Sequence, residues 1–367
     1  MSRKAFIVAI ARTRIAPRGG LHRDKSLHEL AHPVLAHLVQ AAKGAGMGRG
    51  QVDRVILGNA MAAGGNPARL CALAALGEEV PAITIDTQCC SGMDAIASAS
   101  ALISSGQDQI IVAGGVESFS QAPQRLRRTA NGFEPYSQAR FAPSLQQDPP
   151  VLVAAQDFAD RYRITRAAQE AYAVKSHSRT LAHTSDPMIR DPFARALSPE
   201  FCRRLPPLIR KNDTALTALT VAPEADAAAA VLVVSEALAK RFPWAVEIVD
   251  AHQTGCAPET PALGGLVAAQ QLLSRHPRVR RDRITAVELM ESFAAQAIQN
   301  QTELGFPEGI VNARGGLLAA GHAIGASGAV LVGNLVLRLT QQARGDYGLA
   351  LIPAAGGLGS AILCRKR

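Results

Sequence analysis

Short apolar runs alternate along the chain with longer stretches of small residues that favour helices. Strands are predicted by the apolar runs at 5–11, 109–112, 227–234, 245–249 and 349–352. Helices are predicted over about 91–105, 165–182 and 327–342. Gly106 is expected to end the first helix, and Thr165 is expected to cap the start of the second. The pattern therefore predicts an α/β protein.

Two segments of the chain follow the same order, which indicates a diverged duplication. In each, a Ser-Gly pair opens a helix, a strand follows, and a glycine-rich turn comes next. The turns read Ala113-Gly114-Gly115-Val116-Glu117-Ser118 and Ala355-Gly356-Gly357-Leu358-Gly359-Ser360. Two strand–helix–strand halves imply parallel sheets covered by helices, and they can bring one reactive loop from each half to a shared cleft. Residues 119–225 are richer in Arg, Gln and Pro, which indicates an inserted, mainly helical lobe.

The length and composition are typical of a folded globular chain. With 367 residues and 48% hydrophobic content, it can bury a large core. The apolar stretches are far shorter than the roughly 20 residues that a membrane helix needs, so no membrane span is predicted. Arg12 and Arg14 close the N-terminal apolar run before a cleavage site can develop. We therefore expect a first strand of a cytoplasmic protein rather than a signal peptide.

Charge and cysteine content limit the partners that we expect. The formal net charge is +9, and basic clusters at 125–128 and 275–283 can attract phosphate. Aromatic residues make up only 4% of the chain and no recognition motif accompanies the charge, so no nucleic-acid partner is predicted. The six cysteines form no CxxC pair and no metal-ligand spacing with histidine, so no bound metal is predicted.

Cys89 is the first candidate for chemistry. It stands where the β-rich run at 82–85 has ended and Ser91-Gly92 opens the predicted helix. A thiol at a strand-to-helix junction lies near the unpaired amides and the positive dipole end of the helix. This position favours thiolate over thiol, and so it predicts a nucleophile.

His322 is the second candidate, on the glycine-rich turn at 315–328. A histidine of near-neutral pKa can take a proton from a thiol and return it to a leaving group. An arbitrary histidine at such a place would more often cap or pack the following helix. Its position in the duplicate of the Cys89 turn favours the catalytic interpretation.

At these residues the sequence resembles the thiolase family, over nearly the whole chain. The matching blocks are Ile7–Thr13, Leu57–Asn59, Asn66–Arg69, Cys89–Met93, Ala113–Pro123, Ala159–Arg166, Ser176–Arg179, Glu291–Gln296 and the turn that holds His322. A single glycine-rich loop would be weak evidence, whereas this ordered set is specific.

The resemblance implies a fold, a site and an assembly. It implies two duplicated βαβ-type halves in a five-layer αβαβα arrangement, with residues 1–118 plus 226–254 as the N-terminal half and 255–367 as the C-terminal half. Residues 119–225 would form the inserted loop domain. The thiol of Cys89 would take an acyl group from a coenzyme A thioester, and His322 would activate it. No permanent cofactor is implied, and a homodimer or homotetramer is expected.

Departures from the family pattern fall inside the implied active site. Pro353 stands where thiolases place a second cysteine, the acid/base that moves the α-proton, and proline has no ionisable group. Met290 replaces an asparagine that holds an oxyanion-site water, and losing one such donor costs about 2.7–4 kcal/mol. The Gly-Gly-Gly loop becomes Ala355-Gly356-Gly357, whose backbone can still serve as an oxyanion site if Ala355 tolerates the required conformation.

The substrate-binding residues implied by the resemblance are Met290, Phe293 and Arg210. Arg210 either meets a phosphate of coenzyme A or is a surface arginine, and the sequence favours neither. The stretch at 213–226 is shorter than in typical thiolases, in the region that helps to hold coenzyme A.

Two functions from different classes are consistent with this sequence. The first is a thiolase-like acyltransferase in which Cys89 and His322 work on an acyl-CoA or acyl-carrier thioester, without Claisen condensation or thiolysis by the usual route. The second is a catalytically weak thiolase-fold protein that binds acyl thioesters or a partner subunit.

Overall fold

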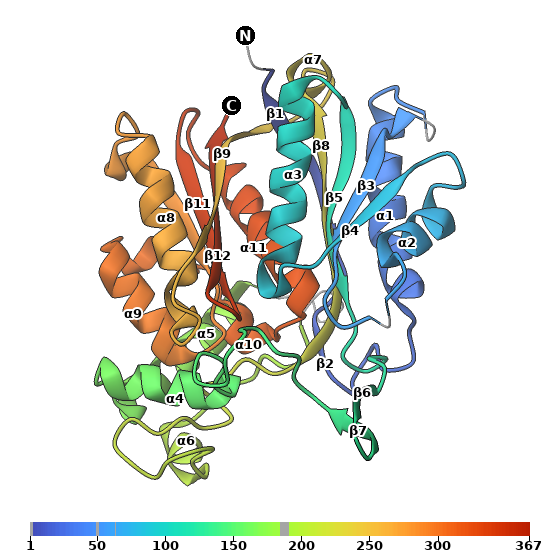
Figure 1. The fold of residues 1–367 in the computed structure, drawn as a ribbon. Coiled ribbons are helices and arrows are strands. Elements are labelled where there is room, and N and C mark those ends of the chain that lie inside the picture. The colour runs from blue at the N-terminus through green and yellow to red at the C-terminus, as the bar shows by residue number, and fades with distance from the viewer. Residues whose placement is uncertain (1–2, 49–50, 63, 184–190) are drawn as a thin grey trace.

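The computed structural model describes residues 3–48, 51–62, 64–183 and 191–367, and it forms five layers (Figure 1). Helices α1 (Leu27–Gly44) and α2 (Pro67–Ala75) cover one outer face, and α8 (Gly264–Arg275) and α9 (Ala294–Leu304) lie on the opposite side. Two central helices, α3 (Ser91–Ser105) and α11 (Ile324–Leu339), lie between the two sheet layers. The predicted α/β fold with a five-layer arrangement is confirmed.

The strands of both layers join in one ten-stranded sheet. Its order along the main path is β10 (Ile284–Leu289), β11 (Tyr347–Ala354), β12 (Leu358–Lys366), β9 (Val246–Gly255), β1 (Ala5–Arg12), β8 (Ala225–Ser235), β5 (Ile110–Glu117), β3 (Arg54–Gly58) and β4 (Ala82–Ile85). The short strand β2 (Ala16–Pro17) pairs with β8. Only three residue pairs, Ala5–Ile248 to Ile7–Val246, join β1 to β9. This narrow junction links the two layers.

The expectation of parallel sheets is wrong, because the sheet is mixed. β3 pairs in parallel with β4 and β5, and β10 pairs in parallel with β11. β8 runs antiparallel to β1 and β5, and β12 runs antiparallel to β9 and β11. The strand–helix–strand pattern of each half predicts the parallel pairs. It does not predict the antiparallel pairs, because most of them join strands from distant parts of the chain.

The helix predictions hold with small shifts. α3 has the expected bounds, and Gly106 ends it in a left-handed conformation with φ 84°. The hydroxyl of Thr165 accepts a hydrogen bond from the amide of Ala168 at 3.2 Å, so the predicted cap is confirmed for α5 (Arg166–His183). α11 begins at Ile324, three residues before the expected start.

The predicted inserted lobe contains α4 (Val151–Arg161), α5 and α6 (Pro199–Arg204). It also holds a hairpin of β6 (Arg125–Thr129) and β7 (Gly132–Tyr136), which protrudes from the body of the molecule (Figure 1) and which the sequence did not predict. The predicted domain limits stay a prediction. β9 pairs with β12 at nine positions, beside strands of the predicted C-terminal half, although residues 226–254 were assigned to the other half.

The central helices pack closely because small residues face each other. A Cβ atom on Gly328 of α11 would lie 2.4 Å from the backbone nitrogen of Met93 in α3, so only glycine fits there. Buried side chains of both helices, among them Ile96, Ile103 and Leu335, fill the core between the sheet layers. This packing fixes the N-terminal ends of the two helices against each other. Among the described residues, no helix is long and apolar enough to cross a membrane.

Candidate active site

Cys89 lies in a strained turn between β4 and α3. The chain enters a short 3₁₀ turn, Gln88–Cys90, through Gln88, whose φ of 56° is in the left-handed region that side chains other than glycine rarely adopt. The amide of Thr87 donates to the hydroxyl of Ser91 at 2.9 Å, and that hydroxyl donates to the carbonyl of Gln88 at 2.5 Å. Such a conformation costs about 1–3 kcal/mol and is common beside reactive groups.

His322 reaches the same point from the other half of the chain. It follows α10 (Leu317–Ala320) and Gly321, whose φ is 118°. The amide of His322 donates to the carbonyl of Pro223 at 2.8 Å, which anchors the turn to the end of the inserted lobe. The imidazole Nε2 lies 3.1 Å from Sγ of Cys89. The two side chains selected from the sequence are therefore brought together, across 233 positions of chain.

Ser327 determines the tautomer of His322. Its hydroxyl lies 2.7 Å from Nδ1 of His322, and it donates its own proton to the carbonyl of Ala323 at 3.1 Å. The hydroxyl oxygen is therefore the acceptor for an Nδ1–H proton, which leaves Nε2 as the acceptor that faces the thiol. Sequence reasoning named Ser327 only as a helix start, although its position five residues after the histidine was visible.

Burial makes both members of the pair neutral. Desolvation raises the pKa of the Cys89 thiol to about 12, although the backbone amides of Cys89 and Ala355 oppose it. Desolvation lowers the pKa of His322 to about 4. The expectation that the helix terminus favours thiolate is wrong for the resting site, because the cost of burying the charge exceeds the effect of the helix end. Proton transfer to Nε2 must therefore accompany attack by the sulfur.

The second glycine-rich turn completes the surroundings of the thiol. Pro353 is buried in β11 opposite Gly359, and the chain turns back to β12 through Gly356 and Gly357 at φ 77° and 76°. Ala355 lies outside the left-handed region, so replacing the family's glycine introduces no strain there. Its backbone amide is directed at the sulfur of Cys89. The backbone amides of Cys89 and Ala355 both lower the pKa of this thiol, so both are donors that act on its sulfur.

Glycine also allows the two reactive loops to touch. A Cβ atom on Gly92, three residues after Cys89, would lie 2.7 Å from the carbonyl oxygen of Gly325, three residues after His322. No larger side chain can occupy that position without moving the loop. The glycines in these two segments therefore have a steric role, because they let the two segments lie in contact.

The three residues predicted to bind substrate lie in different environments. Met290 is fully buried in the core cluster between the layers, and Phe293 is half-buried just before α9. Arg210 lies on the lobe, where its guanidinium pairs with Asp157 and Asp160 at 2.7 Å each. Two carboxylates already neutralise Arg210, which favours the surface interpretation over a phosphate contact.

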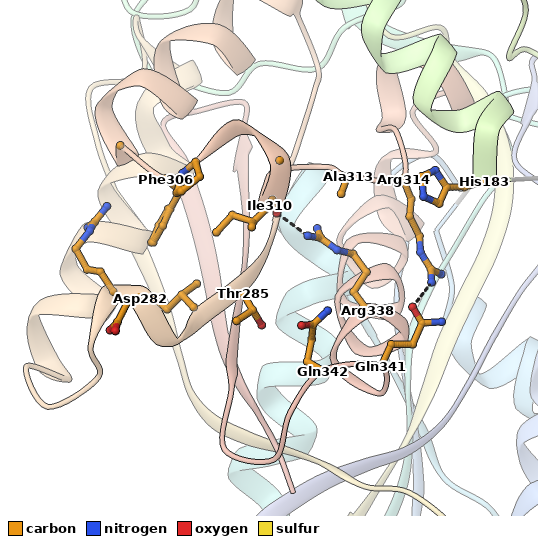
Figure 2. Close-up of a pocket in the computed structure, with 15 residues that line it drawn as sticks. His183, Asp282, Thr285, Phe306, Ile310, Ala313, Arg314, Arg338, Gln341 and Gln342 are labelled. Carbon is orange, nitrogen blue, oxygen red and sulfur yellow. Dashed lines mark hydrogen bonds between the residues drawn. The ribbon is translucent and has the colours of Figure 1, made fainter.

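A cavity of about 860 Å³ lies elsewhere, near the C-terminal end of α11 (Figure 2). Arg338 donates there to the carbonyl of Ile310 at 2.6 Å, and Arg314 donates to Gln341 at 2.8 Å. Neither Cys89 nor His322 lines this cavity. It is therefore separate from the candidate active site.

The fold and the buried thiol–imidazole pair define an acyltransferase of the type built from two repeated α/β halves. Family models for the thiolase N-terminal and C-terminal domains match residues 5–192 and 242–366. The chain belongs to the thiolase family.

Relatives and solved structures agree with this membership. The chain is 36% identical, over 98% of both chains, to a Bacillus subtilis protein named "Putative acetyl-CoA C-acetyltransferase YhfS". It is 33% identical to the "Probable acetyl-CoA acetyltransferase" of Mycolicibacterium smegmatis, over 98% of this chain and 100% of that protein. The crystal structure of the Bacillus anthracis acetyl-CoA acetyltransferase superposes with a TM-score of 0.89 at 28% identity, covering 100% of this chain and 99% of that one. The Acat5 thiolase of Ascaris suum, solved in complex with coenzyme A, gives 0.88 at 26% identity with full coverage of both.

The neutral pair predicts an unusual pH profile for Cys89. If His322 removes the thiol proton during attack, the rate of alkylation of Cys89 by iodoacetamide should change by less than about twofold between about pH 8 and 10, because neither group titrates in that range and the nearby Glu117, with a pKa of about 7, stays ionised. An ordinary thiol below its pKa reacts about tenfold faster per pH unit, since only the thiolate attacks. Peptide mapping of the alkylated site gives the rates.

His322→Ala is the matched control for this profile. Without the base, the rate should fall and the tenfold-per-unit dependence of a free thiol should return. A flat profile that survives in His322→Ala would show that His322 is not the base.

Proposed function

We propose that the chain takes an acyl group from an acyl-CoA or acyl-carrier thioester onto Cys89, with His322 as the base. The 3.1 Å contact between Nε2 of His322 and Sγ of Cys89 carries this proposal. The relatives named as acetyl-CoA acetyltransferases and the Ascaris structure with coenzyme A support a thioester substrate.

In the first half-reaction, Nε2 accepts the thiol proton while Sγ forms a bond to the thioester carbonyl carbon. The oxygen of the tetrahedral intermediate accepts from the backbone amides of Cys89 and Ala355, the two amides that favour negative charge on this sulfur. Collapse breaks the bond to the sulfur of the carrier, which leaves as a thiol after taking the proton back from Nε2. The products are an acyl-Cys89 thioester and the free carrier thiol.

The second half-reaction determines the overall activity. Pro353 is buried beside the site and offers no group that can remove an α-proton. Acyl transfer to another nucleophile, hydrolysis, or a condensation driven by decarboxylation needs no such base. We infer that one of these completes the cycle.

Acyl-enzyme formation is testable by intact mass. Incubation with acetyl-CoA or a longer acyl-CoA should add one acyl group to the protein and none to Cys89→Ser. Cys90→Ser is the matched control, because the neighbouring thiol is buried and its Sγ lies against the carbonyl of Ile352 at 3.4 Å rather than against His322. It should acylate as the unaltered protein does. Absence of an adduct with every thioester tried would instead support a protein that binds thioesters or a partner subunit without catalysis.

The role of Pro353 is testable by restoring a thiol. Exchange of the α-protons of acetyl-CoA for deuterium should be undetectable with the unaltered protein and should appear in Pro353→Cys, because only the variant holds an acid/base at that position. Proton NMR of the recovered acetyl-CoA measures the exchange. Exchange by the unaltered protein at the rate of the variant would mean that another residue supplies the base.

We further propose that the chain forms a homodimer or a homotetramer. β4 is the last strand of the sheet, so one of its edges is unpaired among the described residues, and Ile83 on it is 43% exposed. Pairing of two β4 edges would cover this side chain and stiffen the turn that leads to Cys89. A cytoplasmic location also stays a prediction.

Light scattering during size exclusion tests the assembly. The unaltered protein should have the mass of two or four chains, and Ile83→Lys should lower it, because a charge at an edge strand opposes pairing. Phe133→Ser, on the exposed β6–β7 hairpin, is the control, because it tests whether the hairpin forms a contact between chains in addition to the β4 edge. An unaltered protein that runs as one chain would contradict the proposal.

A further inference from the structure

Glu117, at the end of β5, has a fully buried carboxylate that accepts four hydrogen bonds. Its Oε1 accepts from the side-chain amide of Asn59 at 2.8 Å and from the backbone amide of Met61 at 3.2 Å. Its Oε2 accepts from the backbone amides of Ala60 and Gly325, both at 3.0 Å. Every acceptor direction of this side chain is thus used, and every donor is an N–H group.

Glu291, which follows β10, repeats this arrangement. Its Oε1 accepts from the phenol of Tyr172 at 3.0 Å and from the side-chain amide of Asn312 at 2.7 Å. Its Oε2 accepts from the hydroxyl of Ser176 at 2.8 Å and from the backbone amide of Leu318 at 3.1 Å. The carboxylate is 1% exposed. Tyr172 and Ser176 lie on α5, so this carboxylate also ties the inserted lobe to the site.

The two carboxylates bind opposite ends of one short segment. Leu318 lies four residues before His322, and Gly325 lies three residues after it. We infer that Glu117 and Glu291 are positioning residues, which hold the His322 turn from both sides so that Nε2 stays aimed at Cys89. Neither carboxylate has a hydrogen bond to Cys89 or His322 among the described residues. The inference rests on the proposed pairing of Cys89 with His322.

Charge and geometry explain why carboxylates fill these places. Each oxygen faces two donors, so an amide in place of the carboxylate would point its NH₂ group at two other donors. Burial raises the pKa of Glu117 to about 7, while the donors of Ala60, Gly325 and Met61 favour the ionised form. In its ionised form, Glu117 therefore holds the backbone amide of Gly325 in the His322 turn with a charge-assisted hydrogen bond.

The competing explanation is that these carboxylates only stabilise the fold. Glu288 separates the two explanations, because it is a third buried carboxylate, on β10 and three residues before Glu291. It pairs with the buried Arg338 at 2.6 Å and has no hydrogen bond to the His322 turn among the described residues. Glu288→Gln should therefore weaken the fold without moving His322.

The experiment compares Glu117→Gln, Glu291→Gln and Glu288→Gln in the full chain, below the unfolding midpoint of each. The rate of alkylation of Cys89 by iodoacetamide should fall about 10- to 100-fold in the first two, because a small displacement of the base is enough to lose its assistance. It should stay within about twofold in Glu288→Gln, even where thermal unfolding shows that variant to be less stable. Equal losses in all three, or no loss in the first two, would overturn the inference.

A spectroscopic signature adds a readout that stability does not move. In ¹⁵N spectra of the histidine rings, the signals that disappear in His322→Asn should show the Nδ1–H form in the unaltered protein and in Glu288→Gln. They should shift towards an average of the two tautomers in Glu117→Gln and Glu291→Gln, because the contacts of the ring with Ser327 and Cys89 loosen. Unchanged signals in Glu117→Gln and Glu291→Gln would contradict the inference that these two carboxylates position His322.

Two milder variants keep the test decisive if a Gln variant does not fold. Ser176→Ala and Tyr172→Phe each remove one donor from Glu291 and leave the carboxylate in place. Each should slow alkylation of Cys89 by about two- to tenfold, and rates equal to that of the unaltered protein would overturn the inference. Alkylation needs no acyl donor. If no acyl adduct forms but the Glu117 and Glu291 variants still slow the alkylation of Cys89, the proposed function is overturned and the inference about the two carboxylates stands.

Discussion

The contact between one buried thiol and one buried imidazole governs this molecule. Where desolvation is strong, as it is at Cys89 and His322, an ion pair of thiolate and imidazolium has little solvation to offset the cost of separating the charges. The resting pair is therefore neutral, and a hydrogen bond from Sγ to Nε2 replaces charge attraction as the link between them. A hydrogen bond is much more sensitive to distance and direction than an attraction between charges. Accurate positioning of the two side chains is thus the main task of the surrounding fold.

The five layers accomplish this positioning through the central pair of helices. α3 carries Cys89 just before its first turn, and α11 begins two residues after His322. Because small residues let the two helices approach closely, their ends act as one rigid body, and the sheet layers on either side prevent them from separating. Strain at Gln88 and hydrogen bonds to the two carboxylates then adjust the loops locally. The duplication supplies one reactive loop from each half, and packing of the helices makes them meet.

Much of this was predictable from the sequence, and the failures share a cause. The limits of α3 followed from Gly106, and the cap of α5 followed from Thr165, because both signals are local. The meeting of Cys89 and His322 was expected from the repeated turns. The antiparallel strands, the β6–β7 hairpin and the pKa shifts were not predicted, since each depends on which distant residues surround a segment. The helix dipole is visible at Cys89 in the sequence, but its burial, which decides the charge state, is not.

Compared with the thiolase pattern, we expect Pro353 and Met290 to change the chemistry of the site rather than its geometry. Proline continues β11 and keeps its pairing with Gly359, and Met290 is fully buried in the core between the sheet layers. Both residues therefore fit the surrounding packing but lack the functional group of the thiolase pattern. Pro353 lacks the acid/base of the cysteine, and Met290 lacks the hydrogen-bond donor of the asparagine. The parts that act on a thioester carbonyl remain, namely the thiol, the imidazole, its serine and the amide of Ala355. In the proposed function, these groups carry the carbonyl chemistry, and no α-carbon chemistry is needed. An acyltransferase whose acceptor supplies its own nucleophile needs the thiol, the imidazole and the backbone donors, and it needs no base for an α-proton.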